Sequence, residues 1–135
     1  MKLLVMAPSH AELIDGPRLI AAAQQHFGDQ VRVVPSRPGW ETDFYLEVTF
    51  DDDTMTVSHF IKNTSVTFDS NDLAVREGVA WYRSLLPVDF PRVIACDPGW
   101  NGHVDLYPGI TAQGIVDGWV DHAIEGWNEG DPDFG

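Results

Sequence analysis

The sequence contains a single cysteine, Cys96, so the chain cannot form an internal disulfide. This cysteine ends the apolar run 93–96, where a thiol usually acts as a small core hydrophobe. No cationic residue lies beside it in the sequence to lower the pKa of the thiol, as a reactive cysteine requires. We therefore expect a structural cysteine and a reducing compartment.

Long hydrophobic runs are also missing. The apolar run from Leu3 to Ala7 is far too short for the core of a signal peptide or for a membrane-spanning helix. The sequence therefore predicts a cytoplasmic protein.

Positive charge is scarce as well: 8 Lys and Arg residues stand against 21 Asp and Glu residues, for a net charge of −13. No Lys or Arg follows Arg92, whereas the segment 93–135 carries Asp97, Asp105, Asp117, Asp121, Glu125, Glu129, Asp131 and Asp133. Nucleic acids and anionic membranes bind through basic surfaces, so neither is expected as a partner. A basic protein partner is favoured, because a field of one sign attracts its opposite.

Apolar and aromatic residues are abundant, at 44% and 11% of the chain, and five of them are tryptophans. Disordered chains lack this apolar content. A chain of this length is typical of one domain and buries about two-thirds of its unfolded surface. We expect a single globular domain over residues 1–135, in which residues 129–135 form a frayed acidic tail.

Two segments carry clear signals for helices. The first helix is expected from Gly16 to about Phe27, with Asp15 as the N-cap and Gly28 as the left-handed stop. The second is expected over 72–86, after a run of capping residues and before a proline.

Between these helices, alternating hydrophobicity predicts strands. Phe44, Leu46, Val48 and Phe50 alternate with polar residues, and the next strand places Met55, Val57, His59 and Ile61 on one face. The whole pattern is β-α-β-β-β-β-α-β-β-α. This order predicts an α+β fold with a mainly antiparallel sheet, or a mixed one if the opening β-α-β unit is parallel.

A third helix is expected from Thr111 to about Trp127. Its apolar side chains fill one arc, and the opposite side carries Asp117, Asp121, Glu125 and Glu129 at successive i, i+4 positions. Like charges at this spacing cost a few tenths of a kcal/mol per pair. The acidic stripe is therefore either a solvated face or a face kept for binding.

The tripeptide Pro-Gly-Trp occurs twice, ending at Trp40 and Trp100. A tryptophan in such a loop either packs back on the core or projects as an interface anchor, a role in which tryptophan is enriched. Asp97 and Asp105 flank the hairpin of Trp100, and an aromatic centre with an acidic rim suits a protein partner.

Enzyme chemistry has weaker support in the sequence. His103 and Asp105 share one face of a predicted strand, and with His59 they could form a metal site or a histidine base oriented by a carboxylate. A structural role for all three residues is the competing hypothesis. No phosphate loop, dinucleotide fingerprint, nucleophile elbow or HExxH pattern is present, so no cofactor is expected.

In size, acidity and predicted architecture, the chain resembles the immunity proteins of bacterial toxin–immunity pairs. The resemblance implies a cytoplasmic inhibitor without chemistry of its own, which caps the active site of a basic toxin. From the charge pattern, we expect the partner-binding residues to be Trp100, Asp97, Asp105, Asp117, Asp121 and Glu125. Adaptation to high salt is an alternative origin of the acidity, but such an adaptation should spread the acids evenly.

Overall fold

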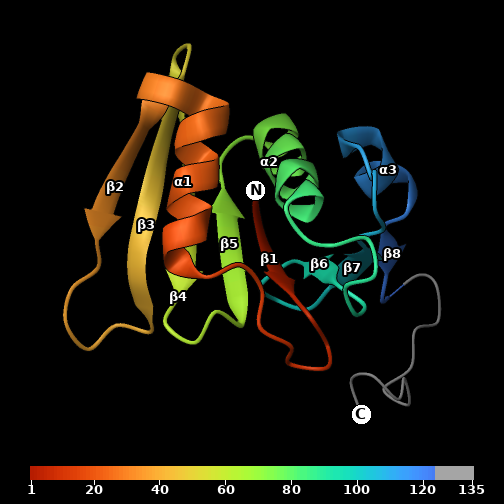
Figure 1. Ribbon diagram of the computed structural model, residues 1–135. Helices are drawn as coiled ribbons and strands as arrows, with labels where there is room; N and C mark the ends of the chain where they lie inside the picture. Colours follow the sequence, from red (N-terminus) through yellow and green to blue (C-terminus); the bar gives the residue numbers. More distant parts are fainter. Residues whose placement is uncertain (124–135) are drawn as a thin grey trace.

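An antiparallel sheet of eight strands, with three helices on one side, forms the structure (Figure 1). The computed structural model describes residues 1–123. The elements are β1 (Lys2–Met6), α1 (Gly16–Phe27), a 3-10 turn η1 (Gly28–Gln30), β2 (Val31–Pro35), β3 (Thr42–Phe50), β4 (Asp53–Phe60), β5 (Ser65–Asp69), α2 (Asp72–Ser84), β6 (Ile94–Cys96), β7 (Gly102–Asp105), α3 (Ala112–Asp117) and β8 (Val120–Asp121). The predicted α+β class and the predicted order of elements are confirmed.

The strand order in the sheet is β2-β3-β4-β5-β1-β6-β7-β8, and each neighbouring pair is antiparallel. β1 lies between β5 and β6, whereas β2 lies at the edge of the sheet. The opening β-α-β unit therefore does not pair its two strands, and the sheet is antiparallel rather than mixed.

The core lies between the helices and one face of the sheet. Alternate strand residues enter it, as the period of two predicts, and Leu46 and Val57 pair there across β3 and β4. From the helices, Leu19 of α1 and Val79 of α2 are fully buried against this face. Each side chain of this size contributes about 1.5–3 kcal/mol when it is fully buried.

The ends of the first two helices agree with their sequence signals. The side chain of Asp15 accepts a hydrogen bond from the backbone N–H of Arg18 at 3.0 Å, and that of Asn71 accepts one from Ala74 at 2.9 Å. Each bond satisfies a donor that the first helical turn leaves unpaired. Gly28, with φ of 62°, ends α1 in a backbone conformation that costs glycine least.

Among the described residues, the prediction of a last helix over 111–127 is wrong after Asp117. Thr111 caps α3 through a hydrogen bond from the N–H of Gly114, but the helix ends at Asp117, and the chain passes through Gly118 into β8. Without β8, strand β7 would be an edge strand with unpaired backbone groups, and Val120 pairs with His103 there. Asp117 and Asp121 therefore do not share a helix face, and Glu125, Glu129 and the predicted tail 129–135 lie outside the described residues.

Within residues 1–123, the helices are too short and too polar to cross a membrane.

Candidate functional site

The loop between β6 and β7 is organised around one carboxylate. Oδ1 of Asp97 accepts hydrogen bonds from the backbone N–H groups of Asn101 at 2.7 Å and Gly102 at 3.0 Å, and Oδ2 accepts one from the Asn101 side chain at 3.0 Å. Burial alone would raise the pKa of Asp97, but these hydrogen bonds together outweigh it and hold the pKa below its ordinary value. Asp97 therefore stays negatively charged at physiological pH.

Trp100, at the tip of this loop, has the left-handed backbone conformation, with φ of 56°. A bulky side chain rarely adopts this conformation, which costs about 1–2 kcal/mol. The indole packs back over the sheet: its ring is stacked on His103 at a centroid distance of 5.7 Å, and it contacts His122 at 4.6 Å. Trp100 is half-buried as a result.

His103 and His122 form a hydrogen-bonded pair beneath the indole. Nδ1 of His103 lies 2.8 Å from Nε2 of His122, and Nδ1 of His122 lies 2.8 Å from the carbonyl oxygen of Trp100. Because a carbonyl can only accept, Nδ1 of His122 is the donor to Trp100. In the neutral pair, His103 then donates to Nε2 of His122. The two rings thus connect the sheet to the backbone of the loop tip.

Asp121 lies close to this loop. It pairs with Gly102 across β7 and β8, and Gly102 itself donates its N–H to Asp97. The structure therefore brings Asp97, Trp100 and Asp121 to one end of β7. We call these three residues and the His103–His122 pair the Trp100 site.

The other predicted partner-binding residues do not join this site. Asp105 lies at the far end of β7, where Oδ1 is 2.7 Å from Nε of Arg92. Asp117 ends α3 and accepts a hydrogen bond from the side chain of Gln113 at 2.9 Å. Glu125 lies outside the described residues. The predicted acidic stripe is therefore not a single surface within residues 1–123.

The alternative set of His59, His103 and Asp105 does not converge. His59 lies on β4 and points into the core beneath α1, whereas Val104 occupies that face of β7 and turns His103 to the opposite one. Strands β5, β1 and β6 separate the two histidines. Within residues 1–123, no group of three or more His, Cys, Asp or Glu side chains could hold a metal ion. The metal site predicted from these residues is therefore not formed.

The second Pro-Gly-Trp loop, between β2 and β3, has a different structure. Trp40 is 50% exposed, and its ring lies 5.8 Å from the guanidinium carbon of Arg37. Identical tripeptides thus place one indole against the sheet and the other in solvent, because only Trp100 has a histidine pair to cover.

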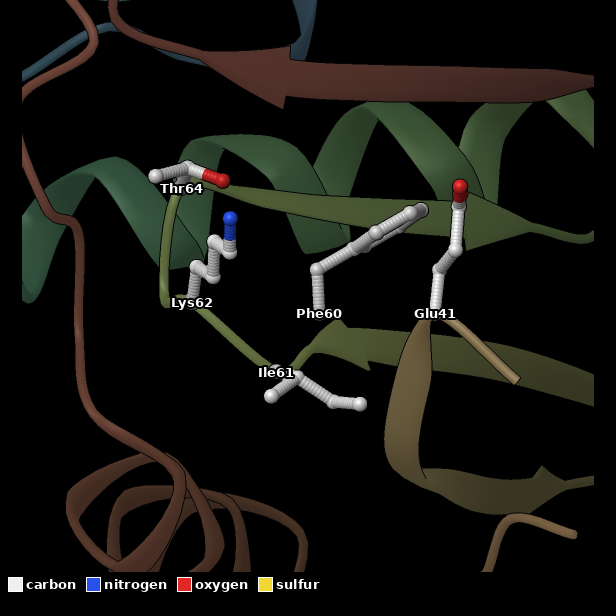
Figure 2. A pocket seen from close by; sticks show the side chains of 5 residues that line it. All are labelled: Glu41, Phe60, Ile61, Lys62 and Thr64. Carbon is white, nitrogen blue, oxygen red and sulfur yellow. The ribbon is translucent and has the colours of Figure 1, made fainter. Parts of the chain in front are cut away.

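A hollow of about 410 Å³ lies beside Glu41, the residue that follows Trp40 in the sequence (Figure 2). Its lining residues come from two segments that are distant in the sequence: Glu41, Phe60, Ile61, Lys62 and Thr64. Figure 2 shows Glu41, Phe60 and Lys62 extending to one side, whereas Ile61 points away from them. Ile61 is 57% exposed, so the prediction that it shares the buried face of β4 is wrong. The hollow combines one acid, one amine and apolar surface, without a nucleophile paired to a base.

Sequence reasoning missed His122 in the Trp100 site. It is 19 positions from His103, and the predicted helix over 111–127 gave it no relation to β7. No local signal could have identified the pair, because the turn after α3 creates it.

The chain matches no protein-family model, no curated protein and no solved structure with which it was compared.

Proposed function

We propose that this protein is a non-catalytic binding protein that recognises a basic protein partner through the Trp100 site. The observation that carries this proposal is the left-handed backbone of Trp100. Two hydrogen bonds hold this conformation in place: the N–H of Asn101 donates to Asp97, and His122 donates to the carbonyl oxygen of Trp100. Backbone strain of this kind persists where surrounding structure enforces it, and it clusters at functional sites.

The charges around the indole support a cationic partner. Asp97 lies within the loop, Asp121 pairs with Gly102 at its base, and the hydrogen bonds that lower the pKa of Asp97 keep its charge in place. An aromatic ring with carboxylates beside it attracts guanidinium and ammonium groups through its π face and through Coulomb attraction. A net charge of −13 steers a basic protein toward this surface.

The class of partner follows from the resemblance to immunity proteins. A toxin domain whose active site binds phosphate is the specific partner that we propose, because carboxylates would occupy its cationic cleft. In this role, the protein neutralises its partner by covering it and performs no chemistry itself.

The experiment is capture of partners from a lysate of the native host with the immobilised protein, followed by quantitative mass spectrometry. Trp100→Gly removes the indole and accepts the positive φ without strain, and Trp40→Gly is the matched control from the identical tripeptide. We expect the wild-type protein and Trp40→Gly to retain the same basic protein, and Trp100→Gly to retain at least about tenfold less of it.

A second pair of variants tests the charges. Asp121→Asn and Asp117→Asn each remove one negative charge, but only Asp121 belongs to the Trp100 site. Asp121→Asn should weaken retention and reduce its salt dependence, whereas Asp117→Asn should behave like the wild type. The proposal fails if Trp100→Gly retains the partner fully or if retention is insensitive to salt.

A further inference from the structure

A second candidate site is lined by residues of α1 and α2, two helices that cover the same side of the sheet (Figure 1). It is a groove of about 260 Å³, and four of its eight lining residues carry aromatic rings. His26 and Phe27 come from the end of α1, Trp81 from α2 and Phe50 from the end of β3, and Met55 and Glu77 also line it. We call these six residues the aromatic groove.

The rings of the aromatic groove contact one another directly. His26 is stacked on Trp81 with ring centroids 5.4 Å apart, and Phe27 meets Trp81 in a T-shaped contact at 5.1 Å. Phe27, Phe50 and Trp81 are each only half-buried, so apolar ring surface remains open to a ligand.

A glycine sets the depth of the groove. A Cβ at Gly78 of α2 would lie 2.9 Å from Sδ of Met55 and 3.1 Å from the ring of Phe68. The absence of a side chain therefore lets α2 approach the sheet closely, with Met55 between them. One face of α2 lines the groove, and it consists of residues 74, 77, 78 and 81.

The charge at this groove is negative. Glu77 is exposed in its wall, and no Lys or Arg is among the described lining residues. The wall residue Phe50 leads directly into the exposed turn 51–53, which consists of three aspartates. Arg76, the neighbour of Glu77, instead lines a separate hollow with Ile115 and Trp119.

We propose that the aromatic groove binds the cationic head of an arginine or lysine side chain from a protein partner. Aromatic faces attract cations, and Glu77 adds a carboxylate at the edge of the site. The volume suits a side-chain head rather than a drug-sized ligand, which needs roughly 300–1,000 Å³. The basic class of partner rests on the proposed function, but the groove is a contact separate from the Trp100 site.

The test is an NMR titration of the full chain, observed at the indole N–H of Trp81, which Trp81→Phe assigns. The ligands are N-acetyl-arginine methylamide and its citrulline analogue, which has nearly the same shape without the charge. We expect the arginine ligand to shift the Trp81 resonance with at least about fivefold higher affinity than the citrulline ligand.

A pair of charge variants localises the effect. Glu77→Gln should reduce the preference for arginine about two- to fivefold, whereas Glu41→Gln, which removes the same charge beside the hollow of Figure 2, should leave it unchanged. Both residues are exposed, so neither change removes core packing.

Equal affinity for arginine and citrulline would overturn the proposal, as would equal effects of Glu77→Gln and Glu41→Gln. These outcomes are independent of the capture experiment with Trp100→Gly. If arginine binds at Trp81 while Trp100→Gly captures its partner normally, the groove stands and the Trp100 site fails. If arginine shows no preference at Trp81 while Trp100→Gly loses its partner, the proposal for the aromatic groove is wrong and that for the Trp100 site is supported.

Discussion

Nδ1 of His59 lies 2.7 Å from Oδ1 of Asp43, although regular alternation along β3 would turn these two side chains to opposite faces of the sheet. A register shift between Thr42 and Phe44 makes Asp43 an extra residue in the ladder, which re-aims its carboxylate. The other ring nitrogen of His59 lies 3.2 Å from the carbonyl oxygen of Ile14. A histidine that is 1% exposed thus ties the segment before α1 to the sheet.

Asp43→Ala should therefore destabilise the protein by about 1–2 kcal/mol, because it leaves a buried ring nitrogen without its acceptor. Glu47→Ala is the control on the same strand, since it removes only an exposed pair with Arg32 and should cost at most about 0.5 kcal/mol. Urea unfolding at pH 7 measures both values. Equal losses would show that His59 does not depend on Asp43.

Asp97→Ala should lower stability by about 1–2 kcal/mol at pH 7, because three donors of the loop lose their acceptor. The pKa of Asp97 is lowered in the folded state, so its contribution is complete above the ordinary value of 3.8 and is lost as the pH falls through the folded value. When the pH is lowered from 5 to about 2, the free energy of unfolding should therefore fall less in Asp97→Ala than in the wild type. Unfolding curves at several pH values test this, with Asp117→Ala as the control; parallel curves would contradict it.

The Cys96 thiol should react slowly in the native protein. Burial, together with the negative charge of Asp97, raises the pKa of Cys96 from 9.0 to about 11. At pH 8 this shift lowers the thiolate fraction about a hundredfold, and the thiolate is the reactive form. The rate with an aromatic disulfide reagent should be at least about a hundredfold lower in buffer than in denaturing urea. Similar rates in both would rule out a protected thiol.

Tyr82 should make the protein sensitive to alkali. Burial raises the pKa of Tyr82 from 10.0 to about 12, against the hydrogen bond that its hydroxyl oxygen accepts from Ile14. A raised pKa means that the contribution to stability is complete below pH 10 and is lost as the pH rises through about 12. Tyr82→Phe should be less stable at pH 7 by about 1 kcal/mol, yet lose less on further alkalinisation. Both chains should carry Cys96→Ala to remove the thiol titration, and identical pH slopes would refute the expectation.

Gly102→Ala should detach Trp119 from the sheet. A Cβ at position 102 would clash with Nε1 of Trp119, so the indole must move, with a cost of about 1–3 kcal/mol. Gly99→Ala is the control in the same loop, because the nearest atom there is the amide nitrogen of the Asn101 side chain, whose displacement costs its hydrogen bond to Asp97 but leaves Trp119 in place. The Trp119 indole resonance and the free energy of unfolding report the change. An unaltered resonance in Gly102→Ala would contradict this packing.

The sequence predicted the layers of this fold well, for a local physical reason. The alternation from Phe44 to Phe50 determines which face of β3 is buried, and the caps Asp15 and Asn71 determine where α1 and α2 begin. Such signals act within one turn or one strand, so they can be recognised without knowing what packs nearby.

The errors arose where long-range contacts compete with local preference. The apolar arc after Thr111 favours a helix, but pairing with β7 ends it at Asp117. Arg83 of α2 belongs to a residue type that is seldom fully buried, yet it is buried here, and it donates to the carbonyl oxygens of Leu106, Leu86 and Pro87. Hydrogen bonds to these backbone carbonyl oxygens offset the cost of burying the charged guanidinium group. No sequence pattern predicts which carbonyls will lie beside it.

By itself, therefore, the sequence determined an acidic α+β domain, with the order of its elements and the residues that form its core. Only the tertiary structure decided that Trp100 covers a histidine pair while Trp40 is exposed, and that Asp97 and Asp121 are both neighbours of Gly102. Burial patterns depend on neighbouring residues along the chain. Binding surfaces depend on which strands become neighbours in the sheet, and that choice is made by the packing of the whole chain.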